Sequence, residues 1–159
     1  MLIPMLLSCR WFILALLSFG MAGVAAAQSP TAAQSDDRAA VRQAALDYVE
    51  GVYEVDSTRI VRSVHPDLVK IGYYVRSGAY RRGEMAYAQL KTLAATWNRD
   101  QQRVNPDSAR KEVVIYDVLD KTASAKVSAH WGSDYLLLAK TDGRWMIRQI
   151  LWQSPPMDE

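Results

Sequence analysis

His130 is the side chain of this chain best suited to acid–base chemistry, because an imidazole titrates near neutral pH. It is followed by Trp131 and by the dipeptide Gly132-Ser133, which suits a two-residue hairpin turn. Such a turn would place His130 opposite Tyr135 on the next strand. The residues before His130 support a second interpretation, because Ser124, Lys126 and Ser128 alternate with apolar residues and predict a solvent or dimer face.

A second hairpin extends this reasoning to Gln149. The tripeptide 141–143 has the Thr-Asp-Gly sequence of a three-residue hairpin loop, which would pair Lys140 with Arg144 and Tyr135 with Gln149. The two turns together predict that His130, Tyr135 and Gln149 lie side by side. A slip of one residue in either hairpin would separate them.

Aromatic residues could supply the walls of such a site. Tyr48 and Trp97 fall on predicted helical faces and are either pocket walls or plain core. A catalytic pocket would also need acids. Asp67, Asp117 and Asp134 are the nearest, but the sequence does not place two of them together.

Composition excludes several other chemistries. The single cysteine, Cys9, lies in the N-terminal apolar segment, so the remaining chain has neither a disulfide nor a thiolate nucleophile. A total of two histidines argues against a histidine-built zinc site, and we predict neither a metal nor a cofactor. A net charge of +2 gives no argument for nucleic acid. The basic residues between 59 and 82 are interpreted as a solvated face.

The N-terminus has the features of a secretory signal peptide. Arg10 precedes the apolar run 11–17, and Ala25 and Ala27 form a small-x-small cleavage site. Cleavage after Ala27 would leave a periplasmic or secreted protein with no membrane segment. We predict a signal peptide at 1–27, a flexible leader at 28–35, one domain at 36–154 and a tail at 155–159.

The predicted elements are helices followed by antiparallel strands. Helices are expected at 36–55, capped by Ser35, at about 57–65, capped by Asp56 or Ser57, and at 84–97. Strands are expected at 68–75, 79–81, 112–119, 123–131, 134–140 and 144–153. This order predicts an α+β cone, with a strongly bent antiparallel sheet packed around the N-terminal helices.

Several stretches resemble the nuclear-transport-factor-2-like superfamily and, within it, the putative lumazine-binding family. They are residues 48–54 (YVEGVYE), 65–70 (HPDLVK), 123–127 (ASAKV) and 142–147 (DGRWMI). The resemblance implies a bent sheet around the first helix, an apolar pocket at the open end and frequent homodimers through the outer face of the sheet. It covers nearly all of the predicted domain, but the superfamily serves many functions.

We therefore expect an exported, non-catalytic protein that binds a small apolar or aromatic molecule, as a homodimer. Polar contacts would come from His130, Tyr135 and Gln149, and walls from Tyr48 and Trp97. One alternative is an isomerase or dehydratase of the ketosteroid isomerase type, with His130 as base and Tyr135 as acid. Another is a docking or dimerisation module whose outer sheet face, including Met146 and Trp152, binds a protein.

Overall fold

The computed structural model describes residues 32–100 and 103–157. The predicted signal peptide and the start of the leader lie outside the described residues. In chain order the elements are α1 (Ala32–Tyr53), α2 (Ser57–Ser63), β1 (Val64–Arg76), β2 (Ala79–Met85), α3 (Tyr87–Ala94), β3 (Lys111–Val118), β4 (Thr122–Ala129), β5 (Gly132–Thr141) and β6 (Arg144–Gln153). The α+β class predicted from the sequence is confirmed.

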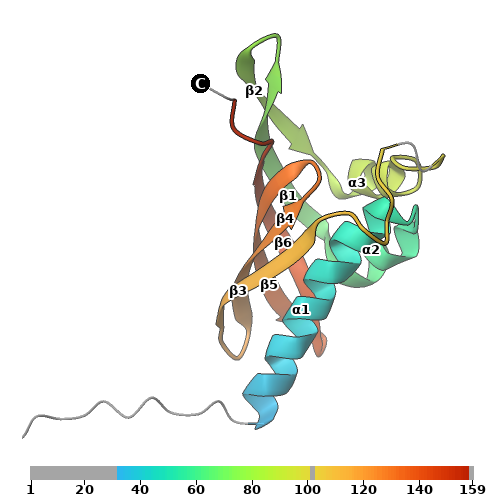
Figure 1. The fold of residues 1–159 in the computed structure, drawn as a ribbon. Helices are drawn as coiled ribbons and strands as arrows, with labels where there is room; N and C mark the ends of the chain where they lie inside the picture. The colour runs from blue at the N-terminus through green and yellow to red at the C-terminus, as the bar shows by residue number, and fades with distance from the viewer. Residues whose placement is uncertain (1–31, 101–102, 158–159) are drawn as a thin grey trace, which may run out of the picture.

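The strands form one six-stranded sheet in the order β2-β1-β6-β5-β4-β3. All neighbouring strands are antiparallel except β1 and β6, which are parallel. Figure 1 shows that α1 crosses one face of the bent sheet, with α2 and α3 grouped near its C-terminal end. The sheet and these helices therefore enclose the interior between them.

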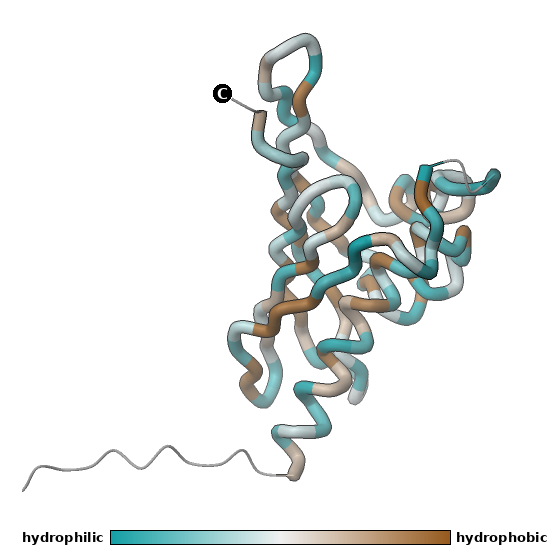
Figure 2. The backbone as a smooth tube through the Cα atoms, viewed as in Figure 1, coloured by the Kyte–Doolittle hydropathy of each residue, from teal (hydrophilic) through white to brown (hydrophobic). Residues whose placement is uncertain are grey.

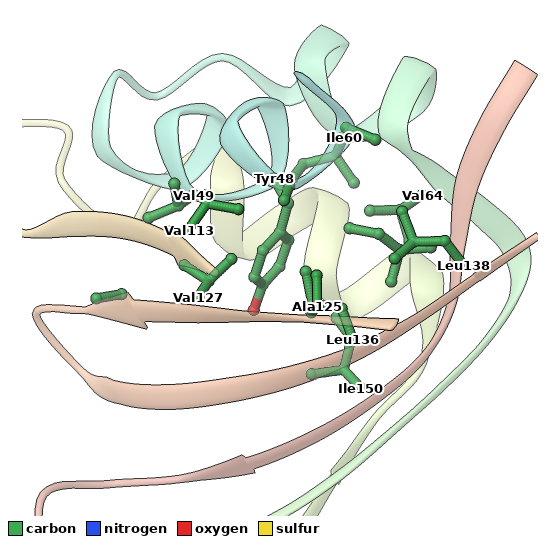
Figure 3. Close-up of a cluster of buried hydrophobic side chains, with 14 of the residues drawn as sticks. Tyr48, Val49, Ile60, Val64, Val113, Ala125, Val127, Leu136, Leu138 and Ile150 are labelled. Atoms are coloured by element: carbon green, nitrogen blue, oxygen red, sulfur yellow. The ribbon is translucent and has the colours of Figure 1, made fainter. Parts of the chain in front are cut away.

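The apolar stripe of α1 forms the centre of the core. Val41, Ala45, Tyr48, Val49 and Val52 recur at helical spacing, and all five are buried. Figure 3 shows Tyr48 pointing from α1 toward the strands, among apolar side chains of the sheet and of α2. Apolar stretches recur along the strands and α1 in Figure 2. The inward positions of the sheet and the stripe of α1 thus pack against each other.

Charged side chains join α1 to α2. Asp47 is 4% exposed and accepts hydrogen bonds from Arg59 at 3.1 Å and from Arg62 at 2.6 Å. Burial alone would raise the pKa of Asp47, but hydrogen bonds from Arg62 and Gln43 outweigh it and lower the pKa below its usual value. The predicted cap of α2 is confirmed, because the Asp56 carboxylate accepts the backbone N–H of Thr58.

Three predicted boundaries were wrong. α1 begins at Ala32, so Ser35 lies inside the helix and does not cap it. β1 begins at Val64 and includes His65, which was expected to end a helix. The third helix starts at Tyr87, because residues 79–85 continue as β2 in pairing with β1. In the last two cases sheet pairing overrides the local preference of the sequence.

The predicted register of both hairpins was also wrong. Asp142 and Gly143 both have positive φ, at 49° and 77°, which defines a two-residue turn and pairs Thr141 with Arg144. The other hairpin turns at His130 and Trp131, so that Ala129 pairs with Gly132. As a result Tyr135 pairs with Lys126 and Leu151, and not with His130 and Gln149. Each shift changes which side chains lie opposite one another.

Candidate functional site

The candidate site is a partly open cavity of about 160 Å³ between α1, α3 and the sheet. Its surface is almost entirely apolar. Eight residues line it: Tyr48, Val52, Lys70, Met85, Leu93, Trp97, Trp131 and Trp152. Three tryptophans and a tyrosine around one small cavity are typical of a site for a flat or apolar molecule.

The aromatic walls are held in place by contacts with one another. Trp131, in the turn between β4 and β5, makes edge contacts with Tyr48, Tyr53 and Trp97 at centroid distances of 6.1, 5.3 and 5.6 Å. Trp97, in the turn after α3, stacks on Tyr53 at 6.0 Å. Edge and offset contacts of this kind are the preferred geometries of aromatic pairs, so these walls are preorganised.

Among the described residues that line the cavity, Lys70 is the only charged one. It is 6% exposed, and its ammonium donates to the Tyr48 hydroxyl at 2.6 Å and to Asp134 Oδ1 at 3.1 Å. Its Nζ also lies 5.2 Å from the centre of the Tyr48 ring and 5.5 Å from the Trp152 ring. The apolar cavity therefore has one cationic group, stabilised by an acid and by two aromatic rings.

Asp134 supports this group from behind the lining. It is fully buried, and its second oxygen accepts the indole N–H of Trp131 at 2.6 Å. Burial raises the pKa of Tyr48 well above its usual value, and the negative charge of Asp134 and a hydrogen bond to it raise this pKa further. Tyr48 thus stays neutral, and the network contains one positive and one negative charge.

The inward position of Lys70 follows from strand alternation. Leu68, Lys70 and Gly72 alternate along β1 and are all buried. Gly72 faces Trp152 in β6, where a Cβ would lie 2.2 Å from both the carbonyl oxygen and Cδ1 of Trp152. A glycine at this position is what allows the Trp152 indole to enter the cavity wall.

The structure brings together only two of the five side chains proposed as a ligand site. Tyr48 and Trp97 lie in the cavity lining, as expected. His130 lies in the β4–β5 turn with its ring 6.2 Å from Trp97, and it is exposed. Tyr135 and Gln149 are exposed on the opposite face of the sheet. The predicted trio is therefore separated, because both hairpin registers differ from those expected.

The other expectations for this region also changed. Asp67 and Asp117 are exposed, so only Asp134 of the three candidate acids is close to the cavity. Trp152 lines the cavity and Met146 is only 4% exposed, so neither offers the exposed apolar surface that the docking alternative assigned to them. Lys70, assigned to a solvated basic face, is buried. Its alternation with Leu68 and Gly72 was the signal in the sequence that would have placed it inside.

A wider and more polar groove of about 670 Å³ lies between α1 and β3. Two arginines in it, Arg38 and Arg42, donate to the carbonyl oxygens of Ile115 and Val113 at 3.0 and 3.2 Å. These bonds satisfy acceptors of an edge strand, which is a structural role. We therefore assign the site to the aromatic cavity.

Two further features bear on the class of protein. No group of three or more histidine, cysteine, aspartate or glutamate side chains among residues 32–100 and 103–157 could hold a metal ion. No helix in the described part of the chain is long and apolar enough to cross a membrane.

A bent sheet wrapped around a long helix, with an apolar cavity at one end, defines the nuclear-transport-factor-2-like class. The family described as putative lumazine-binding matches residues 36–153, and this chain belongs to it. A search of curated proteins found no match.

Solved structures show the same fold at low identity. A nuclear-transport-factor-2-like protein of unknown function from Methylobacillus flagellatus is 18% identical, with a TM-score of 0.58, and covers 76% of this chain and 94% of its own. One from Shewanella baltica is 16% identical, with a TM-score of 0.57, and covers 81% of this chain and 100% of its own. One from Silicibacter pomeroyi is 16% identical, with a TM-score of 0.57, and covers 76% of this chain and 97% of its own.

Proposed function

We propose that this protein is an exported small-molecule-binding domain that holds a small, largely apolar or aromatic molecule without converting it. The cavity is the observation that supports this proposal, because three tryptophans, a tyrosine and three other apolar side chains line it together with Lys70. Such a lining favours binding of an apolar ring by burial and stacking. The name of the family, putative lumazine-binding, agrees with a small heteroaromatic ligand.

The arrangement gives less support to the isomerase or dehydratase alternative. That mechanism was expected to use His130 as base and Tyr135 as acid, and these residues lie on different parts of the molecule. Lys70 and Asp134 are near the cavity but are paired with each other at 3.1 Å. A general base needs a free lone pair, and the Lys70 amino group already donates hydrogen bonds to Asp134 and Tyr48.

The test is native mass spectrometry of the chain from Gln28 to Glu159, purified from the envelope of its host. We expect a retained small molecule of defined mass. Leu93→Trp, which would fill the cavity from α3, should lose it. Leu119→Trp is the matched control, because Leu119 is 60% exposed outside the cavity and should leave the retained mass unchanged. Equal retention in both variants, or none in the unmodified protein, would contradict the proposal.

Export is tested separately by N-terminal sequencing of the same material. The proposed cleavage after Ala27 predicts a chain that begins at Gln28. A protein that keeps residues 1–27 would contradict export by a cleaved signal peptide.

We also propose a homodimer through the outer face of the sheet. Tyr135, Leu137 and Leu151 are 48%, 50% and 55% exposed on neighbouring strands, and Tyr135 pairs directly with Leu151. Contiguous exposed apolar side chains favour association. Leu137→Glu should shift the mass measured by light scattering from dimer to monomer, whereas the control Leu119→Glu should not. A monomeric unmodified protein would refute this proposal.

A further inference from the structure

The structure holds more information about the ligand than the apolar walls alone. Of the eight lining residues named above, Lys70 alone has a formal charge, and an ammonium group has three N–H donors. Two of them have acceptors, namely the Tyr48 hydroxyl at 2.6 Å and Asp134 Oδ1 at 3.1 Å. Among the described residues no acceptor is found for the third. A ligand in the cavity could supply it.

The charge balance decides which kind of acceptor fits. The positive charge of Lys70 is matched by the fully buried carboxylate of Asp134, and Tyr48 is neutral. The Trp131 indole N–H is already donated to Asp134. A ligand carboxylate would bring a second negative charge into an apolar cavity beside Asp134, without a second cation. A neutral carbonyl oxygen accepts the same hydrogen bond and brings no net charge.

The size and walls of the cavity decide what carries this oxygen. An apolar cavity of about 150 Å³ in a protein core binds benzene, and this one measures about 160 Å³. The rings of Trp97, Trp131 and Trp152 offer flat surfaces around it. One aromatic ring fits the enclosed part, and the open side leaves room for substituents.

We infer that the cavity selects neutral aromatic rings that bear a carbonyl oxygen, and that Lys70 binds this oxygen. This inference rests on the proposed function, since it assumes that the cavity takes a small molecule. It adds the chemical class of the ligand and the residue that recognises it.

Three fluorinated probes of similar size test the inference by ¹⁹F NMR titration of ligand-free protein. They are 4-fluoroacetophenone, which has a neutral carbonyl, 1-ethyl-4-fluorobenzene, which has no acceptor, and 4-fluorobenzoate, which is an anion. A hydrogen bond from a charged donor should make the ketone bind at least about fivefold more tightly than the hydrocarbon. The benzoate should bind more weakly than the ketone.

The variant Lys70→Met/Asp134→Asn removes both charges together, so that no unpaired ion stays buried. It should bind the ketone and the hydrocarbon with similar affinity. Lys126→Met, the same lysine replacement on the outer face of β4, should retain the preference of the unmodified protein. The ranking of the three probes by the unmodified protein needs no variant, so it tests the inference even if the double variant does not fold.

The outcomes separate the two claims. Equal affinity for ketone and hydrocarbon, or tightest binding of benzoate, would overturn the inference and leave the proposed binding function intact. A ketone preference that survives in the double variant would overturn the role of Lys70. Binding of none of the three probes would count against the proposed function itself.

Discussion

Breaking the Lys70–Asp134 pair should destabilise the protein strongly, and replacing both members should not. The side chains are 6% and 0% exposed, so removing either one leaves the other buried without its counter-charge. Breaking a buried pair in this way costs about 3–5 kcal/mol. Because a domain of this size is stable by about 5–15 kcal/mol, Lys70→Met or Asp134→Asn alone should lose a large part of that free energy.

The double variant should recover most of the loss. With neither charge present, the amide oxygen introduced by Asp134→Asn can still accept the Trp131 indole N–H, and the methionine introduced by Lys70→Met fills the space of the lysine stem. We expect its free energy of unfolding to lie within about 1–2 kcal/mol of the unmodified protein, since buried pairs replaced together are often nearly neutral. The two single losses should therefore be strongly non-additive.

Urea unfolding followed by tryptophan fluorescence measures all four proteins, because three of the five tryptophans line the cavity. Arg110 and Glu112 provide the matched control. Their charged atoms are 2.7 Å apart, but the side chains are 64% and 67% exposed, so solvent screens the pair and the corresponding cycle should show almost no coupling. Single variants that lose less than about 1 kcal/mol, or additive losses, would refute the reasoning that burial makes this pair essential.

Three further predictions concern the packing and the pH dependence. Gly72→Ala should lower the free energy of unfolding by about 1–3 kcal/mol or more, because the Cβ of the alanine would lie 2.2 Å from the carbonyl oxygen of Trp152. Gly83→Ala, in the facing position of β2, should cost less, since its nearest contact is 3.4 Å; equal losses in urea unfolding would contradict this. The pKa of Asp47 is lower in the folded protein than in the unfolded chain, where it is about 3.9, so the ionised carboxylate stabilises the fold above that pH. This contribution is lost as pH falls through the folded pKa. Asp47→Asn should therefore flatten the decline in melting temperature between about pH 5 and 3. Burial raises the pKa of Tyr48, so Tyr48 should stay protonated at about pH 11. The tyrosinate absorbance of the folded unmodified protein and of Tyr48→Phe should then be the same at this pH. A smaller absorbance in the variant would show that Tyr48 ionises normally.

The sequence was sufficient to predict the fold class because helix and strand periodicities are local. The stripe on α1 identifies that helix and its buried side. The apolar residues of β5 and β6 identify two strands, but Tyr135 and Gln149, which were expected to face inward, are exposed. The register of a hairpin, by contrast, depends on the length of its turn, and one residue more or fewer in the turn changes every pair of the two strands. Thr-Asp-Gly suits both a three-residue loop and the two-residue turn that Asp142 and Gly143 form, and the spacing alone does not distinguish them.

The site was predicted only in part for a related reason. Tyr48 was placed correctly because its helix has a clear buried stripe. Lys70 was missed because a lysine is rarely buried unless it is paired, and its partner Asp134 is 64 residues away along the chain. A pairing over that distance follows from the order of strands in the sheet, which no local pattern contains. The parallel pairing of β1 with β6, which brings the two together, is such a feature.

That parallel pairing also constrains when the protein can fold. β6 lies between β1 and β5, so the first and last strands of the sheet in chain order are neighbours near its middle. While a ribosome is still making the chain, β1 has only β2 beside it, and the Trp152 wall does not yet exist. Native contacts of such long sequence separation form late and slowly. The complete sheet therefore cannot form until the chain has been made to about residue 153. This would suit the export that we propose, because a translocation channel takes a chain that has not yet folded.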